Sequence, residues 1–228
     1  MNNRLLGGTV VALVAFNIAR ALRLFGDFAD AVEFVLAFVL LAAAIRSGLT
    51  LERLGLARKD VRRGLLYGAG AFALVLAVVS AAALIPATSD FLNDSRVDVG
   101  FARMLFEVFV AILFGTVIPE ELIFRGVLLG SAMERWGGLR GALVSSALFG
   151  LWHISPTLND LGGNAGLAEA DSSLLGKTAA VAGAVVATFC AGMIFSWLRE
   201  RSRSLVAPVM AHLSTNGVAF FVAWFVAR

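Results

Sequence analysis

Apolar runs long enough to cross a lipid bilayer recur along this chain, and they constrain its fold more than any other feature. A helix that spans the hydrocarbon core of a membrane needs about 20 mostly apolar residues. The chain is 59% hydrophobic and 15% charged, with few charges inside the runs. The sequence therefore predicts an all-α, polytopic transmembrane bundle of about seven spanning helices in a single membrane-embedded domain, residues 1–228. The predicted spans are Leu5 to Leu22, Ala29 to Ala44, Leu65 to Ile85, Phe101 to Trp136, Leu139 to Ile154, Thr178 to Leu198 and Leu205 to Ala227.

The charges between these runs predict how the bundle sits in the membrane. The connector from Arg46 to Arg63 carries six Lys and Arg residues, and the turns at Arg135 to Arg140 and Arg199 to Arg203 are also basic. The loops Ala87 to Asp98 and Thr157 to Gly176 are acidic on balance. By the positive-inside rule the basic loops are cytoplasmic. This predicts a multi-pass protein of the cell membrane, with its N-terminus cytoplasmic and its C-terminus extracytoplasmic. The net charge of +3 is too small to indicate a nucleic-acid partner.

Two carboxylates and a guanidinium stand inside the fourth apolar run, at Glu120, Glu121 and Arg125. An ionisable group at bilayer depth is costly unless it is paired or hydrated, so it marks a functional site by default. On a helix, Glu121 and Arg125 lie one turn apart on the same face, while Glu120 is rotated by about 100°. We therefore expect Arg125 to neutralise Glu121, which leaves Glu120 for chemistry.

The two histidines of the chain also fall in predicted spans. His153 follows Phe149 by four residues, and His212 precedes Asn216 by four, so each pair shares a helix face. A lone histidine in a membrane usually hydrogen-bonds a neighbouring helix. Three helices that each bring a proton-handling or donor side chain instead suggest a common site.

This set of side chains suits hydrolysis of an amide bond by an activated water. Glu120 would act as the general base, and His153 would help hold and polarise the water. His212 and Asn216 would donate to the oxyanion of the tetrahedral intermediate. Neither a serine nor a cysteine lies in a recognisable pattern beside a histidine and an orienting carboxylate. Covalent catalysis is therefore disfavoured.

A metal site is the alternative use of the same residues. Glu120, His153 and His212 would form a catalytic zinc set with an open fourth position. The usual spacing of two histidines four residues apart on one helix is absent. Because Asn216 on the face of His212 suits an oxyanion better than a metal, we expect no metal cofactor, with zinc as the alternative.

The ordered motifs resemble a known family. Glu120-Glu121-x-x-x-Arg125, Phe149-x-x-x-His153 and His212-x-x-x-Asn216 look like the three motifs of the CAAX prenyl protease type II family of intramembrane proteases, also called the Abi or CPBP group. The resemblance places the motif-bearing core at about residues 101–227. It implies a glutamate-type peptidase in which Glu121, Arg125 and Phe149 support the site. The resemblance does not supply a particular substrate. We expect a membrane-associated, possibly lipidated peptide or protein, entering laterally or from the cytoplasm.

Two other functions remain open at this stage. A non-catalytic membrane protein of the bacteriocin-immunity type would need no chemistry from Glu120 or the histidines. A transporter would use them to relay protons, although no inverted repeat is visible.

The remaining polar and aromatic groups of the spans have simpler interpretations. Asn17 is expected to donate a hydrogen bond between helices, and Glu107 to pair with Arg103 near the outer membrane interface. Trp152 lies near a predicted span end, where tryptophans usually belong to an interfacial belt. The same interpretation applies to Trp136, Trp197 and Trp224.

Overall fold

The computed structural model describes residues 3–85, 88, 92, 95–163 and 168–228, and the regular elements among them are all helices. Half of the predicted Ala87 to Asp98 loop and part of Thr157 to Gly176 lie outside the described residues. The principal helices are α1 (Asn3–Ala21), α2 (Ala29–Arg46), α3 (Leu51–Leu54), α4 (Val61–Ala83), α6 (Phe101–Phe106), η5 (Glu107–Val117), α7 (Ile118–Glu121), η6 (Leu122–Leu128), α8 (Leu129–Trp136), α9 (Gly138–Trp152), α10 (Ile154–Asp160), α11 (Ala168–Asp171), α12 (Leu174–Ser202), α13 (Val206–Leu213), η8 (Ser214–Val218) and α14 (Ala219–Val226). The predicted all-α class is confirmed.

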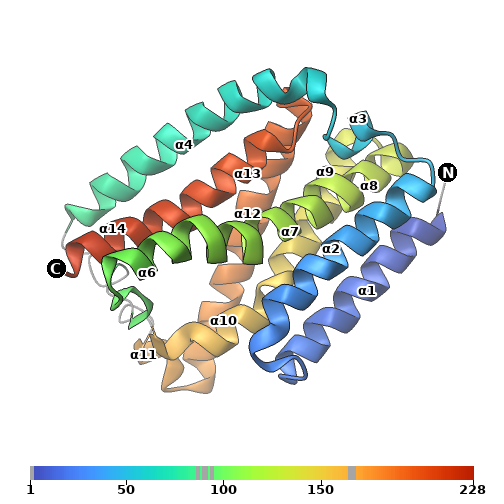
Figure 1. The fold of residues 1–228 in the computed structure, drawn as a ribbon. Helices are drawn as coiled ribbons and strands as arrows, with labels where there is room; N and C mark the ends of the chain where they lie inside the picture. The colour runs from blue at the N-terminus through green and yellow to red at the C-terminus, as the bar shows by residue number, and fades with distance from the viewer. Residues whose placement is uncertain (1–2, 86–87, 89–91, 93–94, 164–167) are drawn as a thin grey trace.

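Six helical stretches among the described residues are long and apolar enough to cross a membrane. They are Asn3–Ala21, Gly26–Arg46, Arg58–Ala83, Phe101–Trp136, Leu174–Ser202 and Val206–Val226. The predicted fifth span corresponds to α9, which has only 15 residues and is followed directly by α10. With α9 as a short seventh traverse, the two chain ends lie on opposite sides of the molecule, as Figure 1 shows. The bundle therefore agrees with about seven spans.

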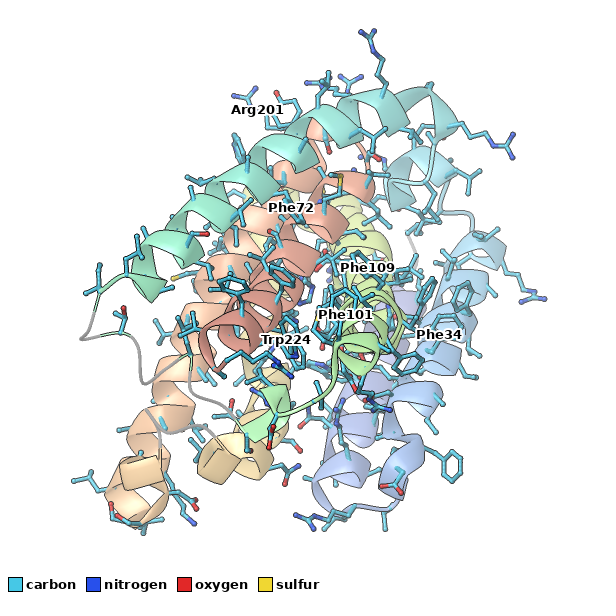
Figure 2. The ribbon with its side chains drawn as sticks, turned by 60° about the vertical axis from the view of Figure 1, so that its left-hand side comes forward. Phe34, Phe72, Phe101, Phe109, Arg201 and Trp224 are labelled. Carbon is cyan, nitrogen blue, oxygen red and sulfur yellow. The ribbon has the colours of Figure 1, made fainter. Side chains whose placement is uncertain are left out.

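The outer surface of the bundle is apolar. Phe101 is 61% exposed and Phe109 is 57% exposed, and Figure 2 shows both rings, together with Phe34, on the outside of the ribbon. Contiguous apolar surface of this kind is rare on soluble proteins, whereas lipid accommodates it. The protein is a multi-pass membrane protein.

The long helix from Phe101 to Trp136 forms the centre of the fold. Its segments contact α2 on one side, α9 on another and α13 on a third. In Figure 1 its green portion crosses between the pair α1 and α2 and the pair α4 and α13. Every residue from Pro119 to Ala132 is buried, which places the predicted carboxylates in the core of the bundle.

The helices α9 and α12 approach each other closely through two glycines. A Cβ on Gly150 would stand 2.7 Å from the carbonyl oxygen of Val185, and one on Gly192 would stand 3.0 Å from the Cβ of Ser146. Small residues allow membrane helices to approach in this way. Gly137, at φ +80°, forms the turn between α8 and α9. These contacts fix α9, which carries the motif residue Phe149 and also Trp152, against the centre of the bundle.

The central helix is irregular around the carboxylates, where Pro119 predicts a disturbance. Wide π-type turns run over η5 before Pro119 and over η6 after Glu121, and only the four residues of α7 between them are regular. A third stretch of this kind, η8, contains Asn216. Proline cannot supply its backbone N–H to a helix, and π-turns are frequent at functional sites. The irregularity extends over both flanks of the motif, further than a single kink at the proline.

Candidate active site

Glu121 and Arg125 form an ion pair that is completely buried. Arg125 Nη1 donates to Glu121 Oε1 at 2.9 Å, and both side chains are 0% exposed. The guanidinium carbon also lies 3.9 Å from the ring centroid of Phe149, a cation–π contact. The predicted pairing across one helical turn is confirmed, and the ring of Phe149 lies against the pair.

His212 joins this pair from another helix. Its Nδ1 lies 2.9 Å from Glu121 Oε1, the same oxygen that accepts from Arg125. Since a carboxylate oxygen accepts, Nδ1 carries the proton in this contact. The ring is held between Phe195, stacked at 5.3 Å, and Phe149, edge-on at 5.8 Å. Sequence spacing did not indicate the contact between His212 and Glu121, because their helices are far apart in the chain.

Glu120 has a different environment from Glu121. Its Oε1 accepts a hydrogen bond from the indole Nε1–H of Trp152 at 2.9 Å. Its Oε2 is buried and has no hydrogen-bond partner among the described residues; His212 Nε2 lies 3.8 Å from it. One oxygen of Glu120 is therefore held by a neutral donor, and the other, although buried, has no partner among the described residues.

The prediction that Trp152 belongs to an interfacial belt is wrong, because the side chain is buried in the bundle. Its side chain is 3% exposed and packs between Phe16, stacked at 5.3 Å, and Phe124, edge-on at 5.6 Å. Trp152 ends α9 and lies near the predicted span end, but α1 covers it. A buried indole N–H needs an acceptor, and Glu120 supplies one.

A cavity of about 510 Å³ brings three of the four predicted catalytic residues together. Glu120, His153 and Asn216 all line it, from three different helical segments. His153 Nδ1 lies 2.8 Å from the carbonyl oxygen of Phe149, so Nδ1 must donate and Nε2 of the neutral ring is an acceptor.

The fourth predicted catalytic residue, His212, does not line the cavity. It is 3% exposed and lies behind the wall. Its Nε2 is 3.3 Å from Asn216 Nδ2, which lies one helical turn away. The expected pairing of His212 with Asn216 is present, and Asn216 is the member of the pair that reaches the cavity.

Two residues of the cavity region were not singled out as site residues from the sequence. Arg20 lines the cavity and donates to Glu33 at 2.9 Å and to Asp30 at 3.3 Å. Glu33 is 1% exposed, with Oε1 lacking a hydrogen-bond partner among the described residues. The available signal was an arginine and two acids at the ends of apolar runs, which also fits ordinary interfacial charges.

The simpler predictions for isolated polar groups are confirmed. Asn17 Nδ2 donates to the backbone oxygen of Trp152 at 2.9 Å, which links α1 to α9. Arg103 Nε donates to Glu107 Oε1 at 2.7 Å, so Glu107 pairs on its own helix.

A three-ligand zinc site would need Glu120, His153 and His212 around one ion. His212 directs Nδ1 to Glu121, and its Nε2 lies 3.3 Å from Asn216 Nδ2 and 3.8 Å from Glu120 Oε2. Over the described part of the chain, no three His, Cys, Asp or Glu side chains are grouped so as to hold a metal ion.

Comparison with protein families gives one match. The model of the type II CAAX prenyl endopeptidase Rce1-like family matches residues 102–218, which contain all three motifs and more than half of the chain. The chain belongs to this family. No curated protein and no solved structure matches it. The membership makes the protein a CAAX-type intramembrane endopeptidase, a membrane-embedded hydrolase of membrane-associated substrates.

Proposed function

We propose that this endopeptidase is of the glutamate type and hydrolyses a peptide bond of a membrane-associated, lipidated peptide or protein. The observation that carries the proposal is the cavity of about 510 Å³ onto which Glu120, His153 and Asn216 converge. The unpartnered Oε2 of Glu120 would supply an acceptor for a water proton. These are the groups that water-mediated amide hydrolysis needs.

The proposed reaction begins with a water held between Glu120 Oε2 and His153 Nε2. Glu120 accepts a proton from the water as its oxygen attacks the carbonyl carbon of the scissile bond. The oxyanion that forms accepts a hydrogen bond from Asn216, whose amide has one N–H for His212 and one for the oxyanion. Glu120 then returns the proton to the leaving nitrogen, the C–N bond breaks, and a carboxylic acid and an amine result.

The proposed division of labour between the two carboxylates follows from their partners. Glu121 is engaged by Arg125 and His212 on one oxygen, so its charge is compensated within the core. Glu120 faces the cavity with only a neutral donor bound. Glu121, Arg125 and Phe149 are therefore proposed as supporting residues, and His212 as the residue that orients Asn216.

The proposed mechanism uses no metal ion. The support is the position of His212 Nε2 against Asn216 Nδ2, together with the lack, among the described residues, of three His, Cys, Asp or Glu side chains grouped to hold a metal ion. Exhaustive chelation, followed by elemental analysis of the purified protein, tests this. We expect full activity at substoichiometric zinc; activity lost on chelation and restored by zinc would overturn it.

The cavity lies toward one end of the bundle, which bears on how a substrate reaches it. Leu92, Val97 and Pro156 line it, and they belong to the segments before α6 and after α9. In Figure 1 α3 lies at the upper right, whereas α10 lies at the bottom. With the basic connector cytoplasmic, as the positive-inside rule predicts, the cavity faces the extracytoplasmic side. We propose entry from that side or laterally from lipid, in place of entry from the cytoplasm.

Cysteine labelling in intact cells tests the orientation. In a Cys190→Ser background, Asn159→Cys in α10 should react with a membrane-impermeant maleimide, while Ser47→Cys in the connector should react only after lysis. Both residues are exposed in the structure. The reverse pattern would place the cavity on the cytoplasmic side.

The activity is tested with two quenched-fluorescent peptides and the protein in detergent micelles. One peptide carries an S-farnesyl cysteine near its C-terminus, and the other is an unmodified apolar peptide. Glu120→Gln should abolish cleavage and leave the melting temperature within a few degrees of the wild type, since the amide oxygen still accepts from Trp152. Glu107→Gln, on the same helix but paired with Arg103, is the matched control and should remain active. Full activity of Glu120→Gln would refute the mechanism.

A further inference from the structure

We propose that Trp152 is the positioning residue for Glu120, and that α1 is part of the catalytic apparatus because it locks Trp152 in place. This inference rests on the proposed role of Glu120 as the base. It assigns a function to a side chain outside the three motifs and to a helix outside the matched residues 102–218.

The hydrogen bond from Trp152 fixes which oxygen of Glu120 is left without a partner among the described residues. The indole Nε1–H donates to Oε1 at 2.9 Å in a buried environment, and no other hydrogen bond to the Glu120 carboxylate exists among the described residues. A carboxylate without this anchor would rotate about its terminal torsions, which are broad. With Oε1 held, Oε2 stays directed to its own side of the site, 3.8 Å from His212 Nε2.

The neutrality of the donor suits this task. An indole N–H donates and carries no charge, whereas a guanidinium would pair with the carboxylate and weaken it as a proton acceptor. The neighbouring Glu121 has such a guanidinium partner in Arg125. Two adjacent carboxylates on one helix thus receive different donors, and the one that faces the cavity receives the uncharged donor.

Contacts from α1 immobilise the indole. The ring of Phe16 stacks on Trp152 with centroids 5.3 Å apart and an interplanar angle of 13°. Asn17 holds the backbone oxygen of Trp152 at 2.9 Å. α1 also contacts α10, the helix that follows Trp152 and His153, and Figure 1 shows the two side by side at the bottom of the view. A donor restrained on both its ring and its backbone presents Nε1–H in one direction.

Kinetics of Trp152→Phe test the proposal with the two peptides named above. Phenylalanine keeps an aromatic ring and removes the N–H. A hydrogen bond to a charged group corresponds to roughly a 10- to 100-fold effect, and we expect a fall of this size in kcat with KM changed by less than about twofold. Trp224→Phe is the matched control, because Trp224 also loses an N–H···O bond, to the backbone oxygen of Val99, and should keep wild-type kcat. Wild-type kcat in Trp152→Phe would overturn the proposal.

Two further measurements separate positioning from packing. Replacing Trp152 by benzothienylalanine, in which sulfur takes the place of the N–H, preserves ring size and should reproduce the kcat loss with wild-type folding. In thermal unfolding, Trp152→Phe should lower the melting temperature more in the wild type than in a Glu120→Ala background, where the acceptor is gone. Equal shifts in both backgrounds would refute the hydrogen bond.

A separate variant tests the hydrogen bond by which α1 holds the backbone of Trp152. Asn17→Ala removes the donor to the Trp152 backbone and should lower kcat in the same direction, with no further loss when combined with Trp152→Phe. Additive losses would show that Asn17 acts elsewhere and would overturn the role of α1.

The two variants Glu120→Gln and Trp152→Phe separate the role of Trp152 from the role of Glu120. If Glu120→Gln is inactive while Trp152→Phe has wild-type kcat, the glutamate mechanism stands and the role of Trp152 falls. If Glu120→Gln is fully active, or if the wild type cleaves neither peptide, the proposed function is wrong. The melting temperatures of Trp152→Phe in the wild type and in the Glu120→Ala background then still decide whether Trp152 holds Glu120.

Discussion

Removal of the Arg125 guanidinium is the perturbation that tests the buried charge cluster most directly. Arg125 and Glu121 are both fully buried and joined at 2.9 Å. Breaking a buried ion pair by removing one partner costs about 3–5 kcal/mol, and a desolvated cation–π contact such as that with Phe149 adds about 2 kcal/mol. We therefore expect Arg125→Met to lower the free energy of unfolding by about 5 kcal/mol or more.

Thermal unfolding in detergent measures this loss. For a chain of this length each kcal/mol corresponds to roughly 2–4 °C, so the melting temperature should fall by about 10 °C or more. Activity should fall with the folded fraction. Glu120→Gln, by contrast, should lose activity without a comparable fall in melting temperature.

The double variant Glu121→Gln/Arg125→Met is the control for the reasoning. Replacing both partners of a buried ion pair is often close to neutral, so it should recover most of the lost stability. The introduced amide oxygen can still accept from His212 Nδ1, whose partner is Glu121 in the wild type. Two results would show that the charges of Glu121 and Arg125 are not energetically coupled. One is a double variant that melts no higher than Arg125→Met, and the other is Arg125→Met with the melting temperature of the wild type.

Two other predictions concern the cavity and the helix packing. His153→Ala and Asn216→Ala should each lower kcat by about 10²–10³-fold while the protein stays folded, as purified activity and size-exclusion profiles will show; unchanged kcat in either would remove that residue from the mechanism. Gly150→Ala places a Cβ 2.7 Å from the backbone oxygen of Val185, so it should lower the free energy of unfolding by about 1–3 kcal/mol. Gly183→Ala, with nothing within 4 Å, should leave the melting temperature unchanged, and an equal fall in both variants would contradict the close approach of α9 and α12.

Local regularities explain what could be predicted. Apolar runs specify spanning helices because each helix satisfies its own backbone hydrogen bonds in lipid, without reference to other segments. The pairs Glu121 with Arg125 and His212 with Asn216 follow from helical spacing alone. α9 shows the limit of such patterns, since its 15 residues are shorter than a full span and its place in the bundle depends on contacts with α12.

Residue spacing within one helix could not predict contacts between segments that are distant in the sequence. His212 meets Glu121 across 91 positions, and Trp152 meets Glu120 across 32. Helical phase separated the two carboxylates but did not identify the donor to Glu120. Trp152 fitted an interfacial belt because its distance from the span end was the only information available.

The sequence by itself determined the helical membrane bundle, the three motifs and the pairing of Glu121 with Arg125, because all of these depend on residues within a turn or a span of one another. The tertiary structure decided which side chains surround Glu120. It brings α1 over Trp152, places His212 behind the cavity wall and leaves Glu120, His153 and Asn216 on the cavity itself. Those outcomes depend on how helices pack, since a side chain's burial and partners are set by neighbours that the local sequence does not contain.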